Sequence, residues 1–125
     1  MSSSRFNGHM GMAFTDLFAG VRVRDLAAAR AWYERLLGSE PAFLPNDVEA
    51  VWAVGEHRWF YLLEDPPKAG SALVTIMVAD LDATAEAIAG RGIEPTELED
   101  YGAARKYVFH DPDGNEVGIG QVPAA

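Results

Sequence analysis

VRVRDL, at residues 21–26, and IMVADL, at residues 76–81, are two versions of one pattern. Each version starts as a strand with alternating apolar residues and ends in Asp-Leu, before an alanine-rich stretch with helical spacing. Asp25 and Asp80 suit the N-cap position, because an Asp carboxylate accepts hydrogen bonds from the free N–H groups of a first helical turn. The repeat therefore predicts two similar modules, each of which opens with a strand and a helix.

Three shorter strands are predicted after each helix, bounded by turn residues. In the first half they fall near 41–44, 49–54 and 58–64, and in the second half near 93–98, 105–110 and 116–121. Gly55 and the pair Asp113–Gly114 mark hairpin turns. The sequence thus predicts the α+β class, with the order β-α-β-β-β in residues 14–65 and again in residues 71–122.

Length, composition and charge narrow the possible functions. The 125 residues suit a single domain, which we place at residues 13–125, after a flexible leader at residues 1–12 that resembles a tag remnant. The absence of cysteine excludes disulfides and thiolate metal sites. A net charge of −9 argues against nucleic acid or a membrane as partner; it favours a cationic ligand or simply keeps the protein soluble. No apolar run approaches the roughly 20 residues of a membrane span, so we expect a cytoplasmic protein.

The repeat, together with WYERLLG at residues 32–38 and FHDPDGNEVGI at residues 109–119, resembles the vicinal oxygen chelate superfamily. This superfamily includes glyoxalases, extradiol dioxygenases, fosfomycin-resistance enzymes and bleomycin-resistance proteins. The resemblance covers about residues 14–122 and implies that the two modules combine into one curved mixed sheet around a concave cleft, with the helices on its outer face. It also implies a homodimer, in which the cleft can be shared between chains and the two halves can be swapped.

Members of this superfamily usually hold a divalent metal on the concave face through His, Glu or Gln, but the matching positions here lack such donors. These positions fall on Phe18, Leu73 and Gly118, and a fourth lies on the apolar strand around residues 59–63. A metal site needs several oxygen, nitrogen or sulfur donors in one geometry, which these side chains do not supply. We therefore expect no metal and no other cofactor.

Strand alternation, counted from Phe18, predicts the side chains that line the cleft. Trp52, Trp59 and Tyr61 lie on central strands of the first half, where they either stack on a flat or cationic ligand or fill the core beneath the helix. The predicted ligand-binding residues are Phe18, Arg22, Trp52, Trp59, Tyr61, Leu73, Met77 and Glu116.

The two charged residues of this set have alternative roles. Arg22 stands between core valines and needs an anionic partner, which is an acidic group of the ligand or an internal salt bridge such as one to Glu116, unless it is exposed at the strand end. Glu116 can pair with Arg22, bind an amine of the ligand, act as a general base, or remain exposed beside the turn.

Functions of two classes are consistent with this cleft. The first is a metal-free small-molecule binding protein of the glyoxalase/bleomycin-resistance type, which sequesters a cationic or aromatic compound and so confers antibiotic resistance. The second is a metal-independent enzyme of the same fold, an isomerase, lyase or cyclase, in which Glu116 or His110 transfers a proton. A divalent-metal enzyme with displaced ligands is a third hypothesis, and the sequence does not assign the catalytic residues.

Overall fold

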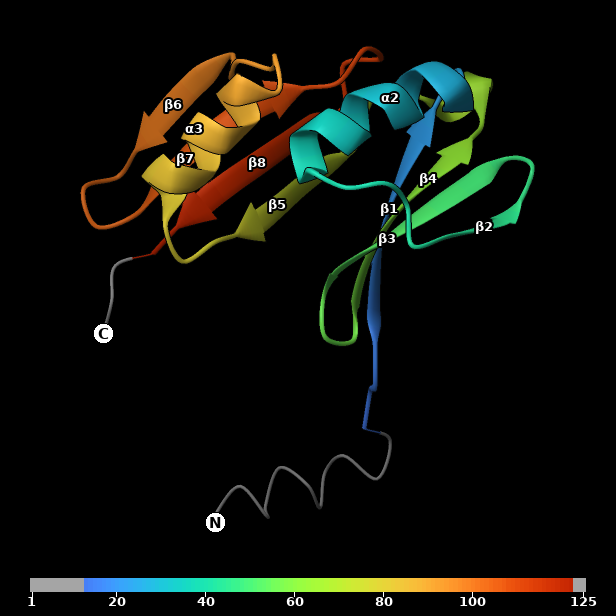
Figure 1. The fold of residues 1–125 in the computed structure, drawn as a ribbon, viewed down its shortest axis with the longest axis horizontal. Coiled ribbons are helices and arrows are strands. Elements are labelled where there is room, and N and C mark those ends of the chain that lie inside the picture. Colours follow the sequence, from blue (N-terminus) through green and yellow to red (C-terminus); the bar gives the residue numbers. More distant parts are fainter. Residues whose placement is uncertain (1–12, 123–125) are drawn as a thin grey trace.

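The computed structural model describes residues 13–122, which form two modules of the same plan (Figure 1). Module one contains β1 (Leu17–Val23), α2 (Leu26–Leu37), β2 (Phe43–Asn46), β3 (Glu49–Gly55) and β4 (Arg58–Glu64). A short turn, η1 (Pro66–Lys68), leads to module two, which contains β5 (Leu73–Met77), α3 (Leu81–Gly90), β6 (Glu97–Asp100), β7 (Arg105–His110) and β8 (Glu116–Gln121). This order confirms the α+β class, whereas the leader predicted for residues 1–12 lies outside the described residues. Nowhere between residues 13 and 122 is a helix long and apolar enough to cross a membrane.

The two aspartates of the repeat begin the helices as the sequence predicts. The Asp25 carboxylate accepts hydrogen bonds from the N–H groups of Ala27 and Ala28, and Asp80 accepts one from Ala83. Gly38 ends α2 in the left-handed conformation, with φ +81°, where a residue without Cβ avoids strain.

The strands form two four-stranded sheets, in the orders β1-β4-β3-β2 and β5-β8-β7-β6. In each sheet the first strand pairs in parallel with the last, and the remaining pairs are antiparallel. Within residues 13–122 the edge strands β1 and β5 are not hydrogen-bonded to each other, so the expected single curved sheet is instead two sheets. Strand β6 starts at Glu97 and not near residue 93 as predicted. The reason is that Ile93 is buried and its N–H donates to the Ile88 backbone oxygen at the end of α3.

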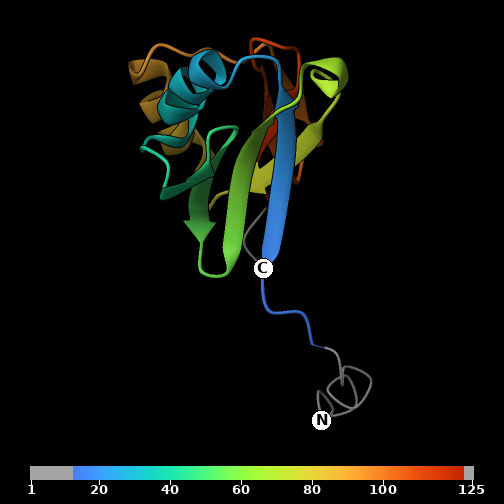
Figure 2. The ribbon, with the colours of Figure 1, turned by 90° about the vertical axis from the view of Figure 1, so that its right-hand side faces the viewer.

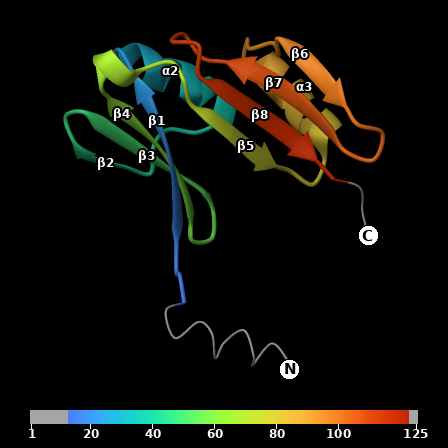
Figure 3. The same ribbon diagram turned by 180° about the vertical axis from the view of Figure 1, so that it is seen from behind.

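The helices lie between the two sheets and cover one face of each (Figures 1 and 2). A single core joins the modules, with Tyr33 of α2, Trp52 and Phe60 of the first sheet, and Ile88 and Phe109 of module two all buried. The opposite, uncovered side of each sheet is here called its open face. The open face of module one is toward the viewer in Figure 2 and that of module two in Figure 3, so the two open faces point in different directions.

The DPDGN turn links the two modules through two buried polar residues, Asp111 and Asn115. The Asn115 amide donates to the backbone oxygen of Arg22 at 2.9 Å and to Asp111 Oδ2 at 2.8 Å, and its oxygen accepts the N–H of Ala72 at 2.9 Å. Tyr33 of α2 donates its hydroxyl to the same Asp111 oxygen at 2.8 Å, and burial together with this carboxylate raises the pKa of Tyr33. The turn therefore fixes how β1, α2 and the start of β5 are placed.

Candidate functional site

The open face of module one carries a group of contacting aromatic rings, Phe18, Phe43, Trp59 and Tyr61, which we call the aromatic face. Phe18 of β1 stacks on Trp59 of β4 with centroids 5.6 Å apart and an interplanar angle of 13°. Tyr61 meets Phe18 edge-on at 6.3 Å, and Phe43 of β2 meets Trp59 edge-on at 6.0 Å. Since Phe18 is 51% and Phe43 46% exposed, the group offers ring surface to a ligand.

Two local features hold these rings in place. A Cβ atom at Gly20 would lie 2.6 Å from the Tyr61 ring, so the glycine lets the tyrosine lie across β1. The Trp59 indole N–H donates to Asp16 Oδ2 at 2.8 Å, and this hydrogen bond is the main cause of the lowered pKa of Asp16. His57 Nδ1 lies 3.5 Å from the other Asp16 oxygen. A carboxylate thus stands at the edge of the aromatic face.

Arg22 lies on the same open face and is paired within the chain. Its Nε is 2.9 Å from Asp65 Oδ2, at the end of β4, so the partner is Asp65 and the salt bridge to Glu116 considered from the sequence does not form. A hollow of about 300 Å³ between β1 and β5 is lined by both Arg22 and Leu73. The guanidinium is half exposed, so it remains within reach of a ligand.

Trp52 does not belong to this site, which corrects its assignment as a ligand-binding residue. It pairs with Phe60 on the helix side of the sheet, where it is only 1% exposed, and its indole N–H donates to the Ser39 backbone oxygen at 2.9 Å. The centroid of its ring is 6.3 Å from that of Tyr33. Strand alternation explains the placement, because Val51 lies opposite Tyr61 and therefore takes the open side of β3.

The predicted residues of the second half lie on the open face of module two. Leu73 pairs with Glu116, and Met77 pairs with Gly120, so all four share one face. Leu73 is 69% and Met77 50% exposed. Near the start of β1, a hollow of about 270 Å³ is bordered by Met77 and by Trp59 of module one.

His110 and Glu116 come together on this face, with Nε2 of His110 3.9 Å from Glu116 Oε1. On the other side of the ring, His110 Nδ1 lies 2.9 Å from the hydroxyl of Thr96, which also contacts the Val108 backbone oxygen at 3.1 Å. Thr96 was not expected from the sequence, because its contact with His110 depends on the register of β6 against β7.

A second polar group lies on the same face, around Lys106. Its ammonium is 3.3 Å from Glu99 Oε1, which also accepts the Tyr101 hydroxyl at 2.7 Å. The hydrogen bond from Tyr101 is the largest cause of the lowered pKa of Glu99, and Lys106 contributes less. The Glu99 carboxylate in turn raises the pKa of Tyr101. A Cβ atom at Gly118 would lie 2.6 Å from Lys106 Cδ, so the lysine stem lies across the glycine. The sequence gives no local signal for this contact.

The residues at the superfamily's metal positions do not fit a metal. Phe18 and Leu73 present exposed hydrocarbon, and Gly118 has no side chain and is covered by Lys106. In the part of the chain that the structure describes, His, Asp and Glu side chains do not gather in groups of three or more able to hold an ion. A metal needs several converging donors, so we derive no chemistry through one.

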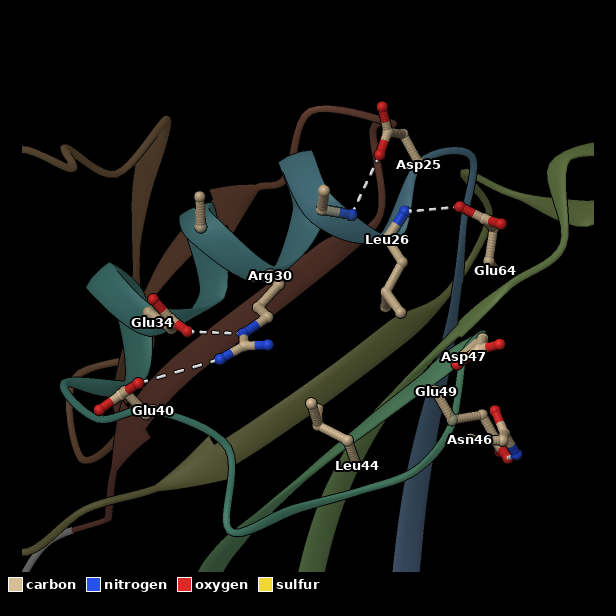
Figure 4. A pocket seen from close by; sticks show the side chains of 12 residues that line it. Asp25, Leu26, Arg30, Glu34, Glu40, Leu44, Asn46, Asp47, Glu49 and Glu64 are labelled. Atoms are coloured by element: carbon tan, nitrogen blue, oxygen red, sulfur yellow. Dashed lines mark hydrogen bonds and ion pairs between the residues drawn. The ribbon is translucent and has the colours of Figure 1, made fainter.

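A separate hollow of about 750 Å³ lies between α2 and the outer strands of module one (Figure 4). Its wall is rich in carboxylates, several of which already have partners. Arg30 pairs with Glu34 at 2.8 Å and with Glu40 at 3.9 Å, while Glu64 accepts the N–H of Leu26 at 2.9 Å (Figure 4). The pair of Arg30 with Glu34, one turn apart, and the contact of Glu64 with a first-turn N–H stabilise α2.

Comparison with known proteins identifies a matching family model and several similar structures. The family model of the Glyoxalase/Bleomycin resistance protein/Dioxygenase superfamily matches residues 14–119. The crystal structure of a glyoxalase/bleomycin resistance protein from Catenulispora acidiphila is 47% identical, with a TM-score of 0.85 over 88% of this chain and 100% of that one. TnmS3, an antibiotic binding protein from a Streptomyces species, shares the fold at 22% identity, with a TM-score of 0.70 over 91% of this chain and 99% of its own. A lactoylglutathione lyase from Agrobacterium tumefaciens does so at 17% identity, with a TM-score of 0.70 over 88% and 93%. No curated protein matches.

Proposed function

Because this chain belongs to the Glyoxalase/Bleomycin resistance protein/Dioxygenase superfamily, we propose that it is a metal-free binding protein that sequesters a cationic aromatic compound. The observation that carries this proposal is the aromatic face, with Phe18 and Trp59 stacked and partly open. Such rings bind flat ligands by stacking and attract cations through their quadrupole, by about 0.5–2 kcal/mol per contact. A structure of the same fold belongs to an antibiotic binding protein, and we propose antibiotic resistance as the corresponding role.

Charge supports a cationic ligand. The chain carries a net charge of −9, which raises the local concentration of cations around it. Asp16 adds a carboxylate at the edge of Trp59, and its lowered pKa keeps it ionised at neutral pH. A ligand with an aromatic ring and an adjacent ammonium group would therefore be attracted by the ring surface and by the carboxylate together.

We also propose that the site is completed by a second copy of the chain. Exposed apolar side chains remain on both open faces, including Phe43 on module one and Leu73 on module two. Module one of one copy and module two of its partner would bury these surfaces and enclose a cleft between their open faces, which point in different directions within one chain (Figures 2 and 3). Sedimentation should give a dimer at micromolar concentration, and Leu73→Glu should dissociate it; a wild-type monomer would contradict the proposal. The cytoplasmic location remains a prediction.

Fluorescence titration with a matched pair of probes tests the binding function. Phenyltrimethylammonium and tert-butylbenzene have nearly the same shape, but only the first carries a charge. We expect saturable quenching of tryptophan emission by the cation, tighter than by the hydrocarbon, and abolished in Trp59→Leu. Trp32→Phe serves as the control, because that indole lies on α2, away from the open face. Equal binding of both probes, or quenching that survives Trp59→Leu, would contradict the proposed ligand class.

A metal-independent enzyme is the second candidate function. The observation that favours it is the 3.9 Å contact between His110 and Glu116 on a partly exposed surface. Either group is suited to proton transfer, so a turnover assay with Glu116→Gln and His110→Gln distinguishes an enzyme from a binding protein. A pure binding protein turns over no substrate, with or without these substitutions.

A further inference from the structure

We propose that the open face of module two is a proton-transfer site for small carbonyl compounds, with His110 as general base and Lys106 as the cation that holds the developing oxyanion. This inference rests on the second candidate function and assigns its chemistry to particular atoms. Three observations carry it: the hydrogen bonds around the His110 ring, the position of Glu116, and the placement of Lys106 across Gly118.

Thr96 determines which nitrogen of His110 is free. The Thr96 hydroxyl has a single proton, and it lies 3.1 Å from the backbone oxygen of Val108, which can only accept. Its contact with His110 Nδ1, at 2.9 Å, therefore uses a lone pair of the hydroxyl, and Nδ1 is the donor. The neutral ring consequently carries its proton on Nδ1 and presents the lone pair of Nε2, which is the atom a general base needs.

Glu116 stands on the side of the ring where that lone pair points. Its Oε1 is 3.9 Å from Nε2, too far for a hydrogen bond to the neutral ring but close enough to stabilise an imidazolium. Both side chains remain about one-third exposed, so a ligand can reach the nitrogen. Thr96 is thus a positioning residue, and Glu116 stabilises the cation that forms when His110 takes a proton.

Lys106 supplies a positive charge beside this base. Its stem crosses Gly118, where a side chain would collide with it, and Glu99 holds its ammonium at 3.3 Å. The ammonium has three donor hydrogens, so two remain for a ligand oxygen after the contact with Glu99. The glycine and the glutamate therefore fix the lysine over the centre of the open face instead of leaving it in solvent.

The spacing of the two groups suits a carbonyl and its neighbouring carbon. Lys106 and His110 lie on the same side of β7, about 13 Å apart at Cα from the strand rise, and the lysine bends over Gly118, which is paired with Val108 between them. By the same rise, the lysine stem over Gly118 lies about 7 Å along the strand from the level of His110. A substrate that bridges the two groups would place its carbonyl oxygen against the ammonium and its α-carbon about 3–3.5 Å from Nε2.

The reaction follows from these positions. Nε2 of His110 takes the proton of the α-carbon, the C–H electron pair forms a C=C bond, and the carbonyl π pair moves to oxygen as an enolate held by Lys106. When a solvent deuteron is returned to the same carbon, the result is exchange. With an α-hydroxy ketone, the hydroxyl proton passes to the enolate oxygen, and His110 returns its proton to the former carbonyl carbon, so that the carbonyl moves to the neighbouring carbon and the result is isomerisation. No electron donor, acceptor or co-reactant is required. The substrate class is therefore a small ketone or aldehyde with a hydrogen on the α-carbon.

Exchange of α-hydrogen for deuterium, followed by proton NMR in D₂O, tests the site. The probe is phenacyltrimethylammonium, a cationic aryl ketone that also suits the aromatic face, and tryptophan emission measures its binding in the same samples. The wild-type chain should accelerate exchange about 100-fold or more over buffer, as positioned general bases do. His110→Gln should abolish the acceleration, and Lys106→Met should reduce it at least about tenfold. Arg35→Met, which removes an exposed cation on α2, should leave it unchanged.

The outcomes separate this site from the proposed binding function. Quenching without accelerated exchange overturns the proton-transfer site alone, exchange without quenching overturns the binding role of Trp59 alone, and the absence of both overturns the two together. Exchange that survives His110→Gln would also overturn the assignment. Nitrogen-15 NMR of the full chain should show the Nδ1–H tautomer of His110, preserved in Thr96→Ser and lost in Thr96→Val; an Nε2–H tautomer in the wild type would refute the role of the base.

Discussion

Replacing Asn115 by alanine would remove all the hydrogen bonds of a side chain that is 0% exposed. The substitution leaves the Ala72 N–H and the Arg22 carbonyl without this partner. It also removes one of the two side chains that donate to Asp111 Oδ2, so that only Tyr33 remains. Each unsatisfied buried group costs about 1–3 kcal/mol, so we expect a loss of roughly 3–5 kcal/mol in the free energy of unfolding. That is a large part of the 5–15 kcal/mol typical of a natural domain.

Urea unfolding followed by far-ultraviolet circular dichroism measures this loss, and the melting temperature should fall by about 10–20 °C. Asn46→Ala is the matched control, since Asn46 also binds Glu49 and the Val48 N–H through its side chain but is exposed. We expect this control to cost less than about 1 kcal/mol. If Asn115→Ala cost no more than Asn46→Ala, the DPDGN turn would not be what joins the modules, and the reasoning would fail.

Three further predictions concern single residues. Tyr33→Phe removes the buried hydroxyl bound to Asp111 and should lower the free energy of unfolding by about 1–2 kcal/mol in urea. Gly70→Ala should destabilise by more than about 2 kcal/mol, because the backbone has φ +103° there and the new Cβ would lie 2.6 Å from the backbone oxygen of Asp113. Trp59 emission should change as pH falls through a midpoint below 3.8, because the lowered pKa of Asp16 keeps the indole–carboxylate hydrogen bond intact until that carboxylate is protonated.

Each of these predictions has its own control. Tyr107→Phe should cost less than Tyr33→Phe, since Tyr107 is only partly buried. Gly102→Ala shares the positive φ but has open space around the new Cβ, so its loss should be limited to about 1–2 kcal/mol of backbone strain. Asp16→Asn should abolish the acidic change in emission. A Gly70→Ala variant no less stable than Gly102→Ala would show that the contact with Asp113 relaxes at little cost.

The fold was predictable because its signals are local and occur twice. Asp25 and Asp80 cap the helices through hydrogen bonds within three residues, and a helix cap depends on little beyond its own turn. The arrangement of the two sheets was not predictable in this way. It depends on side chains far apart in sequence, such as Asn115 and Tyr33, meeting in a shared core.

The site was predictable only as far as strand alternation reaches. Counting within each strand from the positions matched to the superfamily's metal ligands, Phe18, Leu73 and Gly118, places Arg22, Met77 and Glu116 on open faces, because side chains alternate regularly along a strand. The same rule does not set the register of one strand against another, so Trp52 could not be assigned to a face from the sequence. Phe43, which contacts Trp59, was missed for the same reason, since β2 meets β3 with an irregular register.

The two modules share one backbone arrangement but carry different side chains at equivalent positions. Phe18 and Leu73 are equivalent positions, since each stands seven residues before the Asp that caps its helix. Phe18 pairs with Trp59 and Leu73 pairs with Glu116, so Tyr61 and Gly118, two residues further along, are also equivalent. In module one the large side chain is Tyr61 on β4, and it extends over the small residue Gly20 on β1.

In module two the relation is reversed, since Gly118 is the small residue and Lys106 of the next strand extends over it. The register of the antiparallel pairs makes Glu49 the counterpart of Lys106 and Ala53 the counterpart of His110. Duplication thus leaves one face of stacked rings and one face of titratable groups. A cleft built from module one of one copy and module two of another would set an aromatic wall against an acid–base wall, so one enclosed ligand could be held by the first and acted on by the second.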